Sequence, residues 1–216
     1  MEHQVFSIAA EHPPKEGMTI STDSRLGNGT KVHFFSLGPG TDISAETYDQ
    51  PVLYIGAAGG GQLSVGQQTA AAGPGDLIFV PAGALCGIKA AGQTGFIYTE
   101  ILMKKEINMN SILKSAEVFS LKNMIDYEKG SIANMDLVSG QGMKFMILSF
   151  DEGCALSEHR APGNALLFAL EGKAVIGYEG KQYPIKEGEN FRFDKNGLHS
   201  VTADGRFKMA LLLVTE

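Results

Sequence analysis

Two stretches of equal length decide the fold. They are Gly75-Asp-Leu-Ile-Phe-Val-Pro-Ala-Gly-Ala-Leu-Cys86 and Gly188-Glu-Asn-Phe-Arg-Phe-Asp-Lys-Asn-Gly-Leu-His199. Each begins with glycine and an acidic residue, and each continues as a short, mostly apolar run that leads into a glycine-containing turn. They lie 113 residues apart, since 188 minus 75 is 113. A short apolar run between turn signals is typical of a β-strand, so the pair predicts one strand-and-turn unit that is used twice.

The 113-residue offset extends without a gap on both sides of these stretches. Val5-Phe6-Ser7 recurs as Val118-Phe119-Ser120. The other matches gather at glycines, and the paired positions include Gly17 and Gly130, Gly40 and Gly153, Gly59 and Gly172, Gly75 and Gly188, and Gly92 and Gly205. Glycines at matching positions indicate matching turns. We therefore expect two domains, residues 1–104 and 117–216, joined by a linker at 105–116 with room for a short helical turn.

The composition suits a folded, glycine-rich β protein. The chain has 216 residues, of which 44% are hydrophobic and 19% charged, and this length can bury a substantial core. Its 27 glycines make up about 12% of the chain, against a usual share of roughly 7%. The net charge of −6 without a basic cluster argues against nucleic acid or a membrane as partner. Two cysteines, short apolar runs and a start without a leader pattern predict a soluble, cytoplasmic protein with free thiols.

Short apolar or alternating segments, separated by turns, predict the strands of each copy. In the first copy these segments are Lys31–Leu37, Val52–Ile55, Leu63–Val65, Leu77–Val80 and Phe96–Met103. In the second copy they are Lys144–Phe150, Ala165–Leu170, Ala174–Tyr178, Asn190–Phe193 and Lys208–Val214. Turn signals recur every 8–12 residues or so and helical periodicity is weak, which predicts an all-β sandwich, barrel or jelly roll.

Two segments of the second copy resemble the motifs of the cupin superfamily. The first motif of that family runs Gly, five residues, His-x-His, three or four residues, Glu, six residues, Gly. Here Gly153 is followed after five residues by His159. The second motif runs Gly, five residues, Pro-x-Gly, two residues, His, and the 188–199 stretch resembles it. The 75–86 stretch resembles it more closely in its scaffold, because it contains Pro81 and Gly83.

The resemblance covers nearly all of both copies and implies a bicupin. The implied fold is all-β, with two tandem double-stranded β-helix (jelly-roll) barrels packed as an intrachain pseudo-dimer. The C-terminal half also resembles small single-domain bacterial cupins of unknown function. In the family the pocket lies inside the barrel, where many members hold a divalent metal with three histidines and one glutamate. Such a set leaves a coordination position open for water or substrate.

The second copy keeps only part of that ligand set. His159 matches the first histidine and His199 the last, whereas Ala161 and Ala165 stand at the other two positions. Two imidazoles alone hold a divalent transition metal weakly. Three interpretations therefore stay open for His159 and His199: the polar floor of a pocket, in which they hydrogen-bond a small organic ligand or each other; a metal site with a reduced ligand set; or structural histidines without a ligand.

Four further side chains of the second copy bear on this pocket. Glu158 and Asn164 are candidates for a third metal ligand, although neighbouring strand side chains point to opposite faces and Glu158 adjoins His159. Arg192 could contact an acidic ligand if its side chain points into the barrel. An outward, solvent-exposed side chain is expected at least as strongly. Phe168 is expected either as an apolar contact for the ligand or as barrel packing.

The first copy departs further from the family pattern. Glu46 and Tyr48 stand at the positions of the histidine pair, Val52 at that of the glutamate and Cys86 at that of the last histidine. This is not an ordinary metal set, so a degenerate N-terminal site is expected. Cys86 is either a reactive thiol that faces the pocket or, with more weight, a small buried hydrophobe.

These residues support three hypotheses about function. The favoured one is a binding module for a small molecule in the C-terminal barrel, and whether the protein is also an enzyme stays open. The runner-up is a metal-dependent enzyme of the cupin dioxygenase or isomerase type. The third gives the first copy a structural role, as a cover for the second barrel. We expect either a monomeric bicupin or a homodimer.

Overall fold

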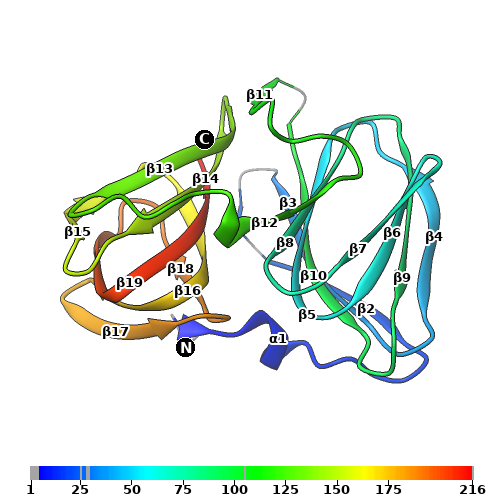
Figure 1. Cartoon of the computed structure of the whole chain (residues 1–216), viewed down its shortest axis with the longest axis horizontal. Coiled ribbons are helices and arrows are strands. Elements are labelled where there is room, and N and C mark those ends of the chain that lie inside the picture. The colour runs from blue at the N-terminus through cyan, green and yellow to red at the C-terminus, as the bar shows by residue number, and fades with distance from the viewer. Residues whose placement is uncertain (1–4, 25, 28–29, 105, 216) are drawn as a thin grey trace. The chain divides into compact units, whose positions relative to one another are not determined.

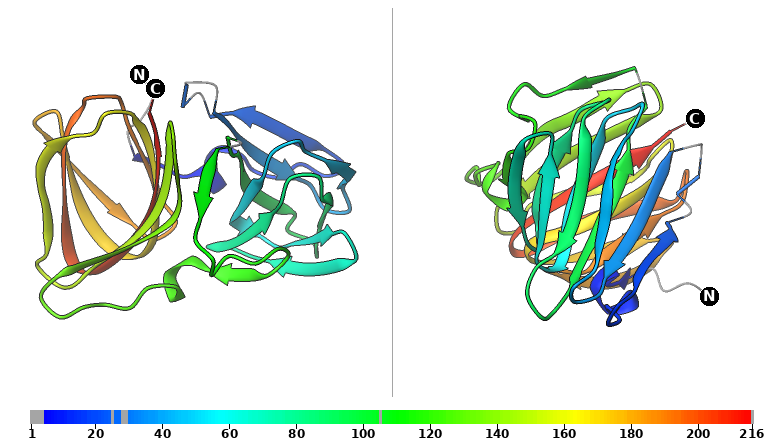
Figure 2. Two further views of the ribbon diagram at one scale, coloured as in Figure 1. Left: turned by 90° about the horizontal axis from the view of Figure 1, so that it is seen from above. Right: turned by 90° about the vertical axis from the view of Figure 1, so that its right-hand side faces the viewer.

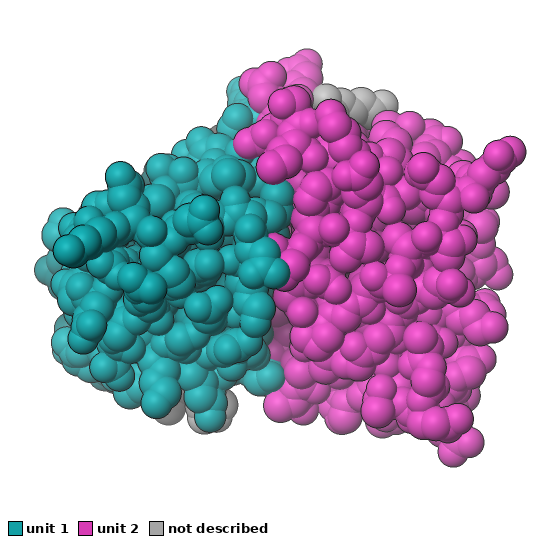
Figure 3. All heavy atoms as spheres, in the orientation of Figure 1, with its two compact units in different colours: residues 1–7, 121–216 teal, residues 8–120 magenta. Residues whose placement is uncertain are grey.

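The computed structural model describes residues 5–24, 26–27, 30–104 and 106–215, and these form β-strands almost throughout (Figure 1). The helical elements among them are α1 (Ile8–Glu11) and a 3-10 turn at Leu121–Asn123. The chain divides into two compact units, residues 8–120 and residues 1–7 together with 121–216, which Figure 3 distinguishes by colour. Within the described ranges no helix is long and apolar enough to span a membrane. The all-β fold class predicted from the sequence is confirmed.

The unit of residues 8–120 consists of two antiparallel sheets. Its strands are β2 (Thr19–Asp23), β3 (Lys31–Leu37), β4 (Asp42–Thr47), β5 (Val52–Gly59), β6 (Gly61–Val65), β7 (Gln68–Ala72), β8 (Asp76–Val80), β9 (Leu85–Ala90), β10 (Phe96–Leu102) and β12 (Val118–Ser120). One sheet has the order β12-β8-β5-β10-β3-β2 and the other β4-β9-β6-β7. Alternate residues of β10, namely Phe96, Tyr98 and Leu102, belong to the core of this unit, as the period of a strand requires.

The other unit is one curved antiparallel sheet. Its strands are β1 (Val5–Phe6), β13 (Ile132–Gly140), β14 (Met143–Phe150), β15 (Ala155–Arg160), β16 (Asn164–Tyr178), β17 (Lys181–Lys186), β18 (Asn190–Phe193) and β19 (Leu198–Val214). The strands follow the order β1-β18-β16-β19-β14-β13, while β15 pairs with β19 and β17 with β16. In the left view of Figure 2 they curve round into a barrel, coloured yellow-green to red. The core inside it is rich in aromatic residues, among them Phe150, Phe191 and Phe207.

The strand pairings of the two units correspond at the 113-residue offset. Corresponding pairs are Thr19–Leu37 and Ile132–Phe150, Glu46–Cys86 and His159–His199, and Tyr54–Ile78 and Leu167–Phe191. The paired glycines agree as well, because every member of the five pairs has a positive φ angle. Gly59 and Gly172 share a second constraint, since a Cβ on either one would collide with a backbone carbonyl, that of Gly95 or of Arg206.

The unit boundaries differ from the predicted domains 1–104 and 117–216. In β1, Val5 lies opposite Phe191 of β18, and in β12, Val118 lies opposite Ile78 of β8. Residues 5–7 therefore lie with the second unit and residues 118–120 with the first. Sequence repetition identified the two segments as equivalent, but it carries no information about which sheet edge each one pairs with.

The predicted linker at 105–116 contains regular structure of its own. Residue 105 lies outside the described residues. After it come β11 (Ile107–Met109) and a turn closed by a hydrogen bond of 3.0 Å from the Leu113 N–H to the Asn110 carbonyl. Ser115 then forms a parallel bridge with Phe79, so the end of this segment already pairs with the first unit.

The predicted strands are present, but several of them are parts of longer ones, for example Lys208–Val214 within β19. Ala165–Leu170 and Ala174–Tyr178 are the two halves of β16, which passes through register shifts beside Gly172 without ending there. The strands that had no apolar run, such as β4 and β15, are largely exposed. Their pairing is decided by backbone hydrogen bonds and not by burial, which is why hydrophobic patterning did not reveal them.

Candidate functional site

The structure brings together the two histidines singled out in the second copy. β15 and β19 are antiparallel neighbours, and His159 lies directly opposite His199 in their register. Their ring centroids are 4.3 Å apart and the rings are tilted by 52°. His199 is 6% exposed whereas His159 is exposed, so the pair reaches from the barrel core to solvent.

Each imidazole is oriented by a backbone carbonyl two residues before it. Nδ1 of His159 lies 2.8 Å from the Ser157 oxygen, and Nδ1 of His199 lies 2.8 Å from the Gly197 oxygen. A carbonyl oxygen only accepts hydrogen bonds, so each Nδ1 must carry a proton and donate it. In the neutral ring, Nε2 is then an unprotonated acceptor that is available to a ligand or a metal.

Burial keeps His199 in this neutral form. Desolvation lowers the pKa of His199 below its ordinary value of 6.5, and neighbouring His159 lowers it further, while the hydrogen bond with Gly197 opposes the shift. Near neutral pH the buried ring is therefore mainly an acceptor at Nε2, because its charged form would lose hydration without gaining an anionic partner.

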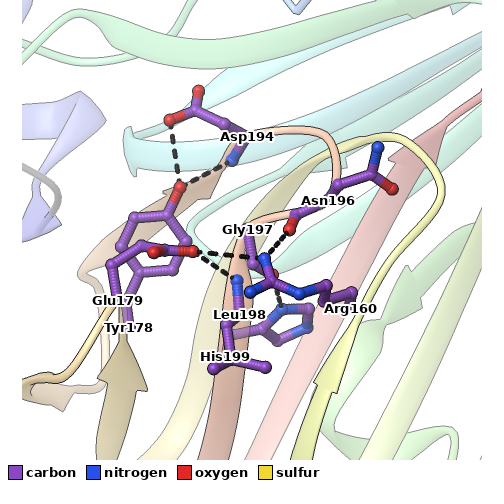
Figure 4. Close-up of polar contacts among 8 residues, drawn as sticks. All are labelled: Arg160, Tyr178, Glu179, Asp194, Asn196, Gly197, Leu198 and His199. Carbon is purple, nitrogen blue, oxygen red and sulfur yellow. Dashed lines mark hydrogen bonds and ion pairs between the residues drawn. The ribbon is translucent and has the colours of Figure 1, made fainter.

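Aromatic side chains surround His199. The ring of Phe193 lies 4.5 Å from that of His199, and both Phe193 and Tyr178 belong to the barrel core. The Tyr178 hydroxyl donates a hydrogen bond to Asp194 at 3.0 Å (Figure 4). The histidine pair thus stands at the boundary between an apolar core and a polar rim.

A network of hydrogen bonds and an ion pair holds the turn that leads into His199 (Figure 4). Arg160 donates to the carbonyl oxygen of Asn196 and forms an ion pair with Glu179 at 3.7 Å. Glu179 in turn accepts a hydrogen bond of 2.6 Å from the Leu198 N–H. Because these groups are exposed, they contribute little stability individually, but together they tie β15, β19 and the end of β16 around the histidine pair.

Arg192 and Phe168, the other predicted ligand contacts, do not join the histidines. The Arg192 guanidinium lies over the ring of Phe6, 5.7 Å from its centroid. Phe168 packs edge-on against Phe145 at 6.5 Å. Both residues alternate with core positions along their strands, and the strand period of two turns them to the outer face of the sheet.

The second unit does not supply a third metal ligand from its candidates. Asn164 accepts a hydrogen bond of 2.7 Å from the Lys195 N–H, and Glu158 is exposed. The described residues contain no group of three or more His, Cys, Asp or Glu side chains placed to hold an ion. His159 and His199 alone fall short of the usual set of three or four protein ligands for a divalent transition metal.

The residues of the predicted degenerate site lie close together in the first unit. Glu46 is opposite Cys86 in the register of β4 and β9, and the Tyr48 hydroxyl donates a hydrogen bond of 2.6 Å to Glu46. Burial raises the pKa of the Cys86 thiol to about 11. Cys86 is therefore a neutral thiol at physiological pH, which favours the buried hydrophobe over the reactive thiol.

Sequence reasoning missed the buried carboxyl group of this site, Glu100. It stands in β10, where all seven residues are buried, and it lies opposite His33 of β3 and Tyr54 of β5. The segment Phe96–Met103 was predicted only as an apolar strand. The sequence did contain a signal, because Glu100 is the single charged residue inside that apolar run. A carboxyl group is rarely buried without partners, so its position indicated a buried polar cluster.

Comparisons with known proteins agree with this fold. Residues 146–215 match the family model of the Cupin domain. A "Cupin 2 conserved barrel domain protein" from Leptotrichia buccalis superposes with a TM-score of 0.87 at 25% identity, over 98% of this chain and 96% of its own. No curated protein has significant sequence similarity to the chain.

Two enzymes share the fold at lower identity. A salicylate 1,2-dioxygenase variant from Pseudoaminobacter salicylatoxidans has a TM-score of 0.70 at 11% identity, over 97% of this chain and 83% of its own. The oxalate decarboxylase of Bacillus subtilis, described with Mn(II) centres, has a TM-score of 0.56 at 13% identity. The match covers 100% of this chain and 78% of the decarboxylase chain. The comparisons thus agree with the all-β jelly-roll fold of the chain and match residues 146–215 to the Cupin domain.

Proposed function

We propose that this chain is a bicupin that binds a small organic ligand in its C-terminal barrel, on His159 and His199. The observation that carries the proposal is the pair of facing imidazoles, each with Nδ1 held by a carbonyl and Nε2 left as an acceptor. Two cupin barrels are supported by the strand registers that recur at the 113-residue offset and by the match to the Leptotrichia protein over nearly the whole of both chains. Their packing as a pseudo-dimer stays a prediction.

The geometry favours a ligand that has both a donor group and an apolar body. Two neutral Nε2 atoms accept hydrogen bonds from a hydroxyl or N–H group, while Phe193 and the core around it offer an apolar wall. Pockets of this kind are mainly apolar, with a few polar groups that fix the orientation of the ligand.

A thermal-shift screen of small hydroxylated and amide-containing metabolites tests this function. Hits should raise the melting temperature of the wild type, and the shift should be lost in His159→Ala and His199→Gln. His12→Gln is the matched control, since it removes a half-buried histidine of the other unit and should leave the shift unchanged. An equal shift in wild type and His159→Ala, or no shift with any compound, would contradict the proposal.

The alternative function is that of a metal-dependent enzyme, and elemental analysis tests it. Elemental analysis of the purified protein should find less than stoichiometric iron, manganese, nickel and zinc if ligand binding needs no metal. A near-stoichiometric metal that disappears in the double variant of His159 and His199 would favour the enzyme, with its missing ligands supplied by solvent or substrate.

A further inference from the structure

The first unit holds a buried carboxyl group that the proposed function does not use. The Glu100 side chain is 5% exposed, and its Oε1 lies 3.4 Å from Nδ1 of His33. Its Oε2 lies 3.2 Å from the Tyr48 hydroxyl, and it also hydrogen-bonds with Tyr54. A carboxyl group in such a place loses its hydration, so partners on three sides are needed to offset that cost.

Tyr48 has one hydroxyl proton and two carboxyl neighbours. Its oxygen lies 2.6 Å from Glu46 Oε1 and 3.2 Å from Glu100 Oε2. The Tyr48 hydroxyl is the donor in both contacts, so its single proton is shared between Glu46 and Glu100, with the shorter contact to Glu46. Burial raises the pKa of Glu100, and its hydrogen bonds with His33, Tyr48 and Tyr54 oppose that shift.

The Tyr98 hydroxyl supplies a second, independent observation. Tyr98 is fully buried, and its hydroxyl has no hydrogen-bond partner among the described residues. Burial and then the charge of Glu100, Tyr48, Cys86 and Glu46 raise the pKa of Tyr98, so this hydroxyl lies among the same groups. A buried polar atom without a partner costs free energy and calls for a missing molecule.

The rings around these carboxyl groups form an aromatic wall. Tyr98 stacks on Phe35 at 5.1 Å with the ring planes only 6° apart, and Tyr54 meets Tyr98 edge-on at 5.7 Å. In the described part of the chain no lysine or arginine forms an ion pair with Glu46 or Glu100, and His33 is the basic partner. Carboxylates beside aromatic faces, with little competing positive charge, are the chemistry that recognises organic cations.

We propose that His33, Glu46, Tyr48, Tyr54, Tyr98 and Glu100, the Glu100 cluster, form a second site that takes a small organic cation of the protonated-amine class. The ammonium group pairs with the ionised carboxyl group of Glu100; where Glu100 is protonated beforehand, its O–H bond breaks and the proton leaves for solvent. The Tyr98 hydroxyl oxygen accepts an ammonium N–H, and the tyrosine faces contact the rest of the cation. No other bond forms or breaks.

Isothermal titration of the full chain with methylammonium, tetramethylammonium and benzylammonium tests the site. Methanol and benzyl alcohol serve as neutral counterparts. Methylammonium or benzylammonium should bind more tightly than tetramethylammonium, which has no N–H, while the alcohols should not bind. Because the cation pairs with the ionised form of Glu100, whose pKa is raised by burial, binding should tighten as the pH rises through that pKa, and the heat should vary with the ionisation enthalpy of the buffer wherever Glu100 releases a proton. The other groups facing Glu100 are His33 on β3, Glu46 and Tyr48 at β4, Tyr54 on β5 and Cys86 on β9.

Variants separate this site from the histidine pair. Glu100→Gln keeps the shape but not the charge, and should weaken cation binding by about tenfold or more. Tyr98→Phe should weaken binding of the two N–H-bearing cations by about two- to tenfold. Glu16→Gln, an exposed control in the same unit, and His159→Gln should leave it unchanged.

Three results would overturn the proposal. They are no binding of any cation at millimolar concentration, equal binding of the neutral alcohols, and unaltered binding by Glu100→Gln. If Glu100→Gln fails to fold, proton release by the wild type and the Tyr98→Phe affinity still decide. Because the histidine pair lies in the other unit, its own proposed function can fail or succeed independently.

Discussion

His199 is buried while its partner His159 is exposed. Because of this burial, His199 should make the free energy of unfolding depend on pH. The folded-state pKa of His199 is lowered, chiefly by burial, so the unfolded chain binds a proton more readily. The stabilising effect of a neutral His199 is fully present above the ordinary pKa of 6.5 and is lost as the pH falls below it. We expect the free energy of unfolding, measured with urea, to decrease below about pH 6.5.

His199→Gln isolates this contribution because glutamine cannot titrate. The variant should show a flatter pH dependence than the wild type in that range, while His159→Gln, at the exposed position, should keep most of it. The same slope in wild type and His199→Gln would show that the decrease comes from other groups.

Glu100 should give the opposite dependence on pH. Burial raises its pKa in the folded state, so the folded chain binds the proton more tightly than the unfolded chain. That stabilising effect is present below the ordinary value of 4.5 and is lost as the pH rises through the raised pKa. Glu100→Gln should therefore gain stability relative to wild type as the pH rises above 4.5 in urea titrations, with Glu16→Gln as the unchanged reference.

Residue identity alone predicted only part of either site. His159 and His199 fell at positions that the cupin motifs mark, and they do face one another. Arg192 and Phe168 stand in the right strands, but the face to which a strand side chain points depends on its register with its neighbours. Glu100 and His33 are distant in sequence and meet only because β10 and β3 pair.

At the scale of single elements, glycine explains how β16 continues where two strands were expected. Gly172 has a φ of 77° beside a register shift, and its Cα faces the backbone carbonyl of Arg206. The strand passes through this bulge and stays paired with β19 on both sides. The turn predicted at Gly172 is therefore wrong, because a bulge and a turn have the same local sequence signal.

Two matched variants, Gly172→Ala and Gly180→Ala, test the close backbone approach at Gly172. Both glycines have φ values near 75°, but a Cβ would meet nothing within 4 Å at Gly180 and a backbone carbonyl at Gly172. Gly180→Ala should cost about 1 kcal/mol of unfolding free energy from backbone strain alone. Gly172→Ala should cost about 3 kcal/mol or more, because the backbone of β19 must also shift. Equal losses in urea denaturation would argue against the close approach.

For the molecule as a whole, the repeat predicted two β units, and the structure divides the chain in two. What the repeat could not predict is that the second unit is discontinuous in sequence. All strands of the sheets in residues 8–120 come from one continuous segment, whereas β18 needs β1 from the other side of that segment. Strands that pair across such a long sequence separation produce no local sequence pattern from which their pairing could be predicted.

Expression of the two segments separately tests this division. Residues 8–120 should unfold cooperatively as a monomer. Residues 121–216 should be less stable or self-associate, because the edge of β18 is open to another chain, and a peptide of residues 1–7 should reduce both effects. A 121–216 segment that is monomeric in light scattering and insensitive to the peptide would show that β1 is dispensable.

The position of β1 also imposes an order of events during synthesis. Val5 leaves the ribosome long before its partner Phe191 has been translated. Residues 8–120 can complete their sheets while the rest of the chain is still being made, and domains generally fold in this vectorial way. β1 must wait unpaired throughout. In the finished protein β1 is therefore paired only after the whole of residues 8–120 has been made, and a fusion partner attached next to β1 would act on the unit whose other strands follow that segment.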